Sequence, residues 1–178
     1  MNNADKQLYN LFYHGETLAV KEIVLRFRKG LTLFVSAYVK NIHDAEDIVS
    51  DTFVKVIIKK PKIKDENYFK TYLYKVAKNL ALDYLKQKKK EVVFYDNYIF
   101  TEDKDLEENI ENKNLVKAIS KLKKEYRLII YLRYYNDFSI EEISKIVSRN
   151  KKYVYNVLNR AKSELKVLLM EVKYERFR

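Results

Sequence analysis

Apolar residues recur every three or four positions along most of the 178-residue chain, which is the spacing of an amphipathic helix. Stretches with this pattern cover residues 43–59, 66–90, 112–122, 125–135, 140–147 and 151–169. Gly occurs only twice and Pro once, whereas strand-rich folds need many turns built from these residues. The pattern therefore predicts an all-α fold.

The helix predicted at 43–59 carries an unusual group of acids in its first half. Asp44, Asp47 and Asp51 share one face, while an apolar face that includes Phe53 lies elsewhere on the helix. A catalytic carboxylate pair is disfavoured because no base or nucleophile lies nearby. Two interpretations stay open: a solvated helix start whose acids offset the helix dipole, or an acidic face that binds a basic helix of another protein.

The helix predicted at 66–90 has an apolar face and a largely basic opposite face. Polar members of that opposite face are Lys75, Lys78, Asn79, Lys86 and Lys89. Four aromatic residues gather at its N-terminal end, namely Tyr68, Phe69, Tyr72 and Tyr74, after a loop that contains Lys62 and Lys64. Lysines along one face suit a phosphate backbone, and aromatics at a loop–helix junction suit stacking on unpaired bases. Alternatively, the aromatics form the core and the lysines are merely solvated.

Residues 137–169 show the pattern of a helix-turn-helix. Ser139 and Glu142 form a capping box before a short helix, the segment 148–150 breaks the pattern, and a longer helix follows. The outward face of the longer helix is polar and basic, as in a recognition helix of the major groove, where Asn pairs with adenine and Arg with guanine. The candidate DNA contacts are Lys151, Lys152, Tyr155, Asn156, Asn159 and Arg160. A plain helical hairpin shares this periodicity.

Charge divides the chain into two basic blocks joined by an acidic segment. The net charge is +11 overall, made up of +7 in residues 1–91, −6 in residues 92–112 and +10 in residues 113–178. A basic protein of this kind favours a polyanionic partner such as nucleic acid. The absence of Cys and the presence of only two His exclude thiolate metal sites and disfavour imidazole sites, so we expect no metal, no cofactor and no catalytic residue.

No apolar run is long enough to span a membrane, and the first ten residues lack the pattern of a secretory signal. We therefore expect a cytoplasmic protein with no membrane insertion.

Together, the segments "DAEDIVSDTFVKV", "YFKTYLYKVAKNLALDYLKQKKK" and "LKKEYRLIIYLRYYNDFSIEEISKIV" resemble, in this order, the extracytoplasmic-function (ECF) class of bacterial RNA polymerase sigma factors. The resemblance runs from about residue 18 to 169 and leaves out the acidic segment. It implies a four-helix domain similar to sigma region 2 in residues 1–91, an acidic linker in 92–111, and a helix-turn-helix domain similar to sigma region 4 in 112–178.

The resemblance also implies a sigma factor that binds core RNA polymerase and directs promoter recognition, strand opening and transcription initiation, without being an enzyme. Asp44, Asp47, Asp51 and Phe53 match the family's polymerase-binding helix. Minus-ten contacts would come from Lys62, Lys64, Tyr68, Tyr72, Lys75, Lys78, Asn79 and Lys86, and minus-thirty-five contacts from the recognition helix. Promoter DNA, core polymerase and an anti-sigma factor are the implied partners.

A transcription regulator that does not join polymerase is the alternative, although it leaves the acidic face without a role. The chain departs from the family where Tyr72 replaces a common Trp, and where Ser148 and Arg149 replace a Gly and an aliphatic residue. Tyr153 and Tyr155 also make an atypical start to the recognition helix. Arg149 predicts a shifted turn between the two helices of this motif.

Overall fold

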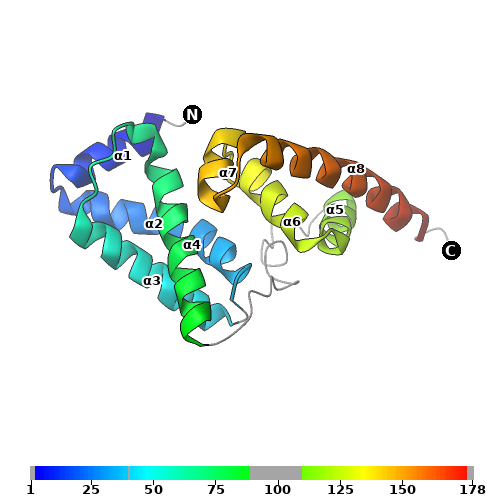
Figure 1. Cartoon of the computed structure of the whole chain (residues 1–178), viewed down its shortest axis with the longest axis horizontal. Helices are drawn as coiled ribbons and strands as arrows, with labels where there is room; N and C mark the ends of the chain where they lie inside the picture. Colours follow the sequence, from blue (N-terminus) through cyan, green and yellow to red (C-terminus); the bar gives the residue numbers. More distant parts are fainter. Residues whose placement is uncertain (1–2, 40, 89–109, 176–178) are drawn as a thin grey trace.

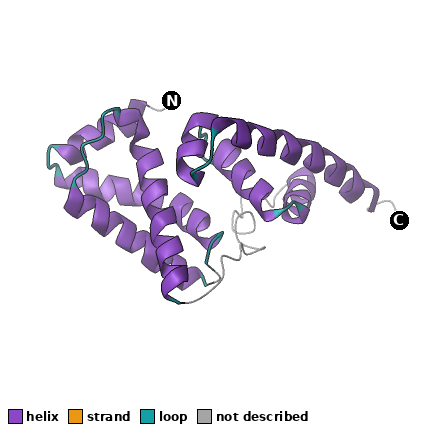
Figure 2. Cartoon of the chain, viewed as in Figure 1, coloured by secondary structure: helices purple, strands orange, loops and turns teal. Residues whose placement is uncertain are grey.

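The computed structural model describes residues 3–39, 41–88 and 110–175, and every regular element in these ranges is helical (Figure 2). The all-α prediction is therefore confirmed. Two groups of helices lie side by side, with the N-terminal group on the left and the C-terminal group on the right in Figure 1. The acidic linker expected at 92–111 lies outside the described residues as far as residue 109, and its last two residues begin a helix.

The N-terminal group contains four helices and one short 3-10 turn. They are α1 (Asn3–Tyr13), α2 (Thr17–Ser36), α3 (Ile42–Lys59), the 3-10 turn Glu66–Tyr68 and α4 (Phe69–Gln87). The long helices α2 and α3 pack against each other and both contact α4, while α1 packs across α2 and α4. Asn41 caps α3, because its side chain accepts a hydrogen bond from the backbone N–H of His43 at 2.9 Å.

The C-terminal group is arranged around its last and longest helix. Its elements are α5 (Ile110–Lys121), α6 (Lys124–Ile130), a π-helical turn (Tyr131–Tyr135), α7 (Ile140–Val147) and α8 (Lys151–Glu175). Helices α5, α6 and α7 each pack against α8, which extends away from the N-terminal group (Figure 1). Helices α7 and α8 occupy the segments for which the sequence predicted a helix-turn-helix.

Local chemistry defines the boundaries of α7. The predicted capping box is confirmed: the Ser139 hydroxyl accepts from the backbone N–H of Glu142 at 3.2 Å, and the Glu142 carboxylate accepts from the backbone N–H of Ser139 at 2.9 Å. Helix α7 ends at Ser148, which adopts the left-handed conformation that usually favours Gly. Arg149 stays exposed and lies over the ring of Tyr153 at 5.5 Å, so its charge is accommodated without entering the core.

One continuous apolar core joins the two groups through α4 and α7. The Tyr74 ring of α4 is buried and meets Phe34 of its own group at 5.0 Å and Phe138 of the C-terminal group at 4.9 Å, measured between ring centroids. Gly30 of α2 allows this close approach because it has no Cβ atom, which would clash with the Tyr74 hydroxyl. The hydroxyl of Tyr131 also donates to the Gly30 carbonyl at 3.0 Å across the junction. The two groups of helices are thus in direct contact.

Candidate binding surfaces

The acidic face of α3 is available to a partner. Asp47 and Asp51 are exposed, and Asp44 is half-buried at the first turn of the helix. Asp44 accepts a hydrogen bond from the hydroxyl of Tyr84 on α4, and this bond raises the pKa of Tyr84. None of the three aspartates is buried against its own domain. A role in binding another protein requires this exposure.

Phe53 occupies a different environment from the aspartates with which it was grouped. Its side chain is only 5% exposed and belongs to the core beside Val49 and Val56. This burial leaves Phe53 almost no surface for direct contact with a partner. Phe53 belongs to the apolar stripe of α3 and packs this helix against the core.

Exposed apolar side chains extend the acidic row, which the sequence interpretation missed. Val54 and Ile58 follow Asp47 and Asp51 at helical spacing and are 53% and 79% exposed. On the neighbouring α2, Leu18 and Leu25 are exposed as well. The signal was visible in the sequence, since Val54 and Ile58 continue the row 47, 51, 54, 58 at steps of three and four.

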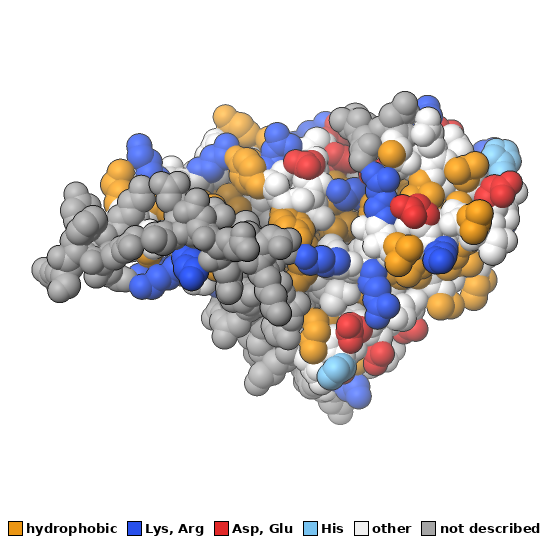
Figure 3. Space-filling view, turned by 180° about the vertical axis from the view of Figure 1, so that it is seen from behind, with side chains coloured by type: hydrophobic (Ala, Val, Ile, Leu, Met, Phe, Trp, Pro, Cys, Tyr) orange, Lys and Arg blue, Asp and Glu red, His pale blue; other side chains and the backbone are white. Residues whose placement is uncertain are grey.

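A shallow hollow of about 390 Å³ lies between α2 and α3. Its walls carry apolar, basic and acidic side chains, including Leu25, Arg28 and Glu46. The space-filling view from behind shows the same mixture on the N-terminal group, where apolar side chains are exposed among Lys, Arg, Asp and Glu (Figure 3). A mixed apolar and charged surface of this kind is typical of protein contacts.

A second surface follows one face of α4 and the loop before it. Lys75, Asn79 and Lys86 are exposed along the helix, and Tyr72 is half-exposed. Lys62 and Lys64 are exposed in the loop. These six side chains form a largely cationic strip that solvent reaches freely.

The hydroxyl of Tyr9, a residue of α1, holds the loop in place. It donates to the carbonyl of Pro61 at 2.9 Å and accepts from the backbone N–H of Ile63 at 2.9 Å. Sequence reasoning did not identify Tyr9, because the two contacts join residues more than 50 positions apart. Its ring is buried against Phe69, so the anchor is rigid.

The aromatic cluster at the start of α4 divides between core and surface. Phe69 and Tyr74 are buried, which settles the open alternative for these two residues in favour of the core. Tyr68 is half-buried, and its ring lies 3.5 Å from the Nζ atom of Lys145 on α7. The remaining aromatic, Tyr72, is half-exposed and belongs to the cationic strip.

Lys78 differs from the other lysines of α4 because the C-terminal group covers it. It is 9% exposed, and its Nζ atom donates to the hydroxyl of Ser148 at 3.2 Å. Burial, together with the nearby charges of Arg149 and Lys75, lowers the pKa of Lys78. The prediction of Lys78 as a DNA contact therefore needs the two groups to separate first.

Four further contacts join α4 and the 3-10 turn before it to the C-terminal group. Lys70 donates to the backbone carbonyl of Asn136 at 2.6 Å, and the Tyr74 hydroxyl donates to the side-chain oxygen of Asn136 at 2.5 Å. Thr71 donates to the Glu142 carboxylate at 3.0 Å, and Tyr68 donates to the Glu141 carboxylate at 3.3 Å. We call these contacts, with those of Lys78 and Lys145, the α4 clasp.

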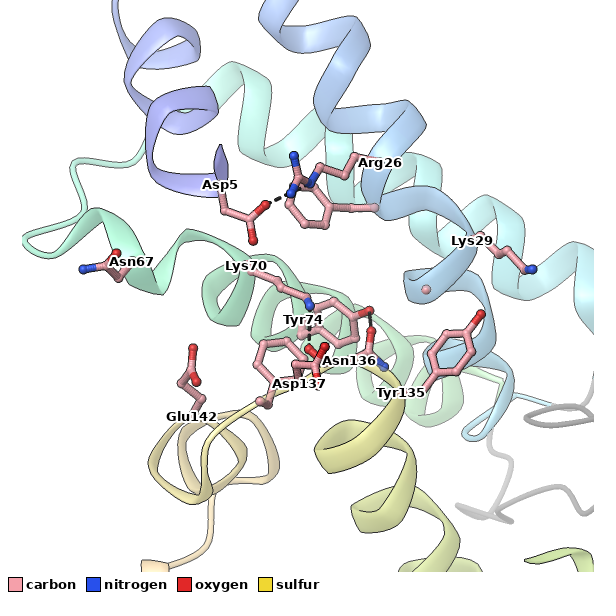
Figure 4. A pocket seen from close by; sticks show the side chains of 13 residues that line it. Asp5, Arg26, Lys29, Asn67, Lys70, Tyr74, Tyr135, Asn136, Asp137 and Glu142 are labelled. Carbon is pink, nitrogen blue, oxygen red and sulfur yellow. Dashed lines mark hydrogen bonds and ion pairs between the residues drawn. The ribbon is translucent and has the colours of Figure 1, made fainter. Parts of the chain in front are cut away.

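A polar cavity of about 750 Å³ interrupts the junction beside the clasp. Asp5, Arg26 and Lys70 line it from the N-terminal group, while Asn136 and Asp137 reach it from the C-terminal group (Figure 4). Arg26 pairs with Asp5 at 2.9 Å on one wall. Basic and acidic side chains are mixed around the cavity, so it shows no preference for a ligand of one charge.

Glu141 links residues from both candidate DNA surfaces. Its carboxylate accepts from Lys151 at 2.7 Å and Lys145 at 3.0 Å, in addition to Tyr68. The bonds from Lys151 and Lys145 lower the pKa of Glu141 to about 2. One carboxylate therefore neutralises a cluster of donors that would otherwise suit a phosphate.

The outward face of α8 is open at the candidate recognition positions. All six proposed contacts are exposed: Lys151, Lys152, Tyr155, Asn156, Asn159 and Arg160. Tyr153 turns the other way and bonds to Glu125 on α6 through its hydroxyl. The atypical tyrosines thus divide their roles, since Tyr153 fastens α8 to α6 and Tyr155 faces outward.

Within the described ranges, no group of three or more His, Asp or Glu residues is placed to hold a metal ion. The helices described here include none with the length and apolarity needed to cross a membrane.

Comparison with known protein families gives two matches in chain order. The sigma-70 region 2 family matches residues 23–91, and the sigma-70 region 4 family matches residues 112–165. The chain is 32% identical over 133 residues to RNA polymerase sigma factor SigV of Bacillus subtilis, which covers 75% of this chain and 80% of that protein. It is 27% identical over 156 residues to the ECF RNA polymerase sigma factor SigM of the same organism, covering 85% and 95%.

Solved structures show the same arrangement of helices. CnrH in complex with the cytosolic domain of CnrY aligns with a TM-score of 0.60 at 22% identity, covering 94% of this chain and 98% of that chain. The sigma factor RpoE in complex with the anti-sigma factor NepR from Bartonella quintana aligns with a TM-score of 0.58 at 20% identity, covering 84% and 96%. At these identities the likeness concerns the fold.

Proposed function

The chain belongs to the ECF class of the sigma-70 family, and we propose that it binds core RNA polymerase through α3 and grips promoter DNA through α4 and α8. As a sigma factor it directs promoter recognition for transcription initiation. The observation that carries this assignment of surfaces is the separation of charge on the N-terminal group: an exposed acidic row on α3 and an exposed cationic strip on α4. A single DNA-binding surface has no use for the acidic row.

The polymerase contact is expected on the row formed by Asp47, Asp51, Val54 and Ile58. The aspartates attract a basic helix of the polymerase and orient it, while the two apolar side chains bury area once the surfaces meet. Asp44 contributes less directly because Tyr84 already engages it. Leu25 on α2, which lines the hollow beside Glu46 of α3, offers further apolar area near this row, and an anti-sigma protein that competes with polymerase would use the same surface.

The DNA contacts divide between the two groups of helices. On the cationic strip, Lys75, Lys86 and the loop lysines neutralise the phosphates of one promoter strand, and Tyr72 offers a ring for stacking on an unpaired base. Extrusion of a base costs a few kcal/mol, which stacking and phosphate contacts must offset. The two hydrogen bonds of Tyr9 hold the loop in the position where it would contact that base. The recognition helix α8 holds the upstream element as duplex.

The chain itself makes and breaks no bond in this proposal, so it is not an enzyme. It works in the cytoplasm, where core polymerase and the chromosome are found. Opening of the strands draws on binding free energy from the polymerase and DNA contacts together.

The polymerase contact is tested by reversing two charges. Asp47→Lys with Asp51→Lys places like charges against a basic partner, so we expect at least about a tenfold loss of affinity for bacterial core polymerase. Both positions are exposed, so the circular dichroism spectrum and the melting temperature should stay close to wild type. Affinity is measured by co-elution and by fluorescence anisotropy of labelled chain.

A matched control separates surface contact from net charge. Glu164→Lys with Glu171→Lys makes the same change in net charge on α8, away from the α3 row, and should keep core affinity. If the α3 variant binds core polymerase as well as this control does, the assignment of the α3 surface is wrong. A wild-type chain that binds duplex DNA specifically but never co-elutes with core polymerase would instead indicate a regulator that does not join polymerase.

A further inference from the structure

We propose that Tyr9 of α1 is a positioning residue whose hydroxyl sets how selectively the loop before α4 chooses a base. Helix α1 carries none of the proposed DNA contacts, so this gives it a part in strand selectivity. The inference rests on the proposed function, in which the loop of residues 60–67 contacts an extruded base. Tyr9 acts through that loop and not on the strand, because its side chain is only 3% exposed.

Helix α1 supports the loop near both of its ends. Lys6 and Tyr9 lie three positions apart and therefore share one face of the helix. The amine of Lys6 pairs with the Glu66 carboxylate at 3.1 Å, where the loop runs into the 3-10 turn. At the start of the loop, the Nζ atom of Lys60 would lie 3.6 Å from a Cβ atom at Gly15, in the turn that follows α1.

The Tyr9 hydroxyl fixes the register of the loop between these ends. A tyrosine hydroxyl can donate and accept at once, and this one uses both capacities on the backbone of Pro61 and Ile63. Exposure alternates along this stretch, as in an extended chain: Pro61 and Ile63 are half-buried, whereas Lys62 and Lys64 are exposed. A shift by one residue would exchange the two sets, so the two hydrogen bonds keep both lysines on the outside.

The Tyr9 ring ties this loop to the helix that carries the cationic strip. Its centroid lies 5.1 Å from that of Phe69, which is the first residue of α4 and is fully buried. The same side chain therefore holds the loop by its hydroxyl and the start of α4 by its ring. This fixes the loop lysines relative to Tyr72, the ring proposed to stack on the base.

A fixed loop matters more for choosing a base than for holding a strand. Phosphate contacts carry no sequence information, whereas contacts to base edges do and need the recognising groups in place. A loop that moves freely must be ordered at each binding event, and this cost falls on the contacts that depend on its geometry. Loss of the Tyr9 hydroxyl therefore lowers discrimination between bases more than it lowers affinity.

Amide hydrogen exchange tests the anchor in the free chain. Tyr9→Phe removes only the hydroxyl and keeps the ring on Phe69, so the fold should persist. We expect the Ile63 N–H to lose at least about tenfold of its protection in this variant, because its acceptor is gone. Tyr13→Phe, one turn further along α1, makes the same chemical change and should keep wild-type protection there. Equal protection of this N–H in Tyr9→Phe and the wild type would overturn the anchor.

Strand selection tests the effect on discrimination. The full chain, bound to bacterial core polymerase, is offered a random library of single strands of about twelve nucleotides, and the retained strands are sequenced. Tyr9→Phe should lose at least about fivefold of the wild-type preference at one position, the lower end of what one good base contact contributes, and keep the preferences elsewhere. Lys75→Ala, which removes a phosphate contact, should weaken retention of all strands about equally. Tyr13→Phe should select strands like the wild type.

The outcomes separate this inference from the proposed function. Wild-type preferences in Tyr9→Phe would overturn the inference, whether or not overall retention falls, because a merely structural role would weaken all strands alike. A wild-type chain that shows no preference at any position would overturn it too. Unchanged retention by Lys75→Ala would instead count against the strand-binding surface of the proposed function. The exchange measurement contains neither polymerase nor DNA, so it decides the anchor in every case.

Discussion

At the scale of single residues, Gly30 shows how a position inside a helix can serve contact between domains. A Cβ atom at this position would lie 2.5 Å from the Tyr74 hydroxyl oxygen and 3.3 Å from the side-chain oxygen of Asn136. The first distance is shorter than van der Waals contact permits, and the buried Tyr74 ring has no room to retreat. Glycine at this position lowers the helix propensity of α2, but it allows the two groups of helices to pack closely here.

Gly30→Ala should destabilise the chain although alanine favours the helix by about 1 kcal/mol. We expect a net loss of about 1–3 kcal/mol in the free energy of unfolding, the range for overpacked sites, measured by urea denaturation. Adding Tyr74→Phe removes the clashing oxygen, so the double variant should be more stable than the sum of the single effects. An additive double variant, or a stabilised Gly30→Ala, would contradict the close approach of α2 and α4 at this point.

At the scale of elements, the sequence predicted the helices well where an apolar stripe and local caps agree. The α3 stripe and the Ser139–Glu142 capping box lie within one helix each, so spacing alone reveals them. Helical spacing placed Lys75 and Lys78 on the same basic face of α4. Of the two, Lys75 is exposed, whereas Lys78 is buried and donates to Ser148 at the end of α7. That difference depends on packing between segments some 70 residues apart, which periodicity cannot report.

The turn between α7 and α8 illustrates the same limit. Arg149 suggested a shifted turn, yet Ser148 has φ of 59° and ψ of 46° and supplies the left-handed residue where the family usually has Gly. The side chain that makes this conformation costly also receives the hydrogen bond of Lys78. Strain in the turn and contact with α4 are therefore linked at one residue.

Two substitutions at Ser148 separate these effects. Ser148→Ala loses the hydroxyl and keeps the strained backbone, whereas Ser148→Gly loses the hydroxyl and relieves the strain. We expect Ser148→Gly to be more stable than Ser148→Ala by about 1 kcal/mol, the usual cost of a left-handed residue with a Cβ atom. Urea denaturation monitored by circular dichroism measures both, and equal stabilities would mean that the turn carries no such strain.

At the scale of the whole molecule, the two domains share one continuous core through Tyr74, Phe138 and their neighbours. The charge pattern predicted two domains and a linker, and it led us to propose one surface for protein and others for DNA. It could not predict that the domains pack together, because the clasp is formed by polar side chains that any solvated surface could carry. We expect this packing to make the stability of each domain depend on the other.

This coupling should be visible in calorimetry of the full chain. With the clasp closed, we expect a single thermal transition whose calorimetric and van't Hoff enthalpies agree, as for one cooperative unit. Asn136→Ala with Glu141→Ala removes two hydrogen-bond acceptors from the junction and leaves the aromatic packing in each domain. The domains should then melt separately. This would give two transitions, or one broad transition whose van't Hoff enthalpy is well below the calorimetric enthalpy. Glu164→Ala, outside the clasp, should keep the single sharp transition. Two separate transitions in the wild type would show that the junction contributes too little to couple the domains. Cooperative unfolding requires the contact between α4 and α7 to be lost together with the cores on either side of it.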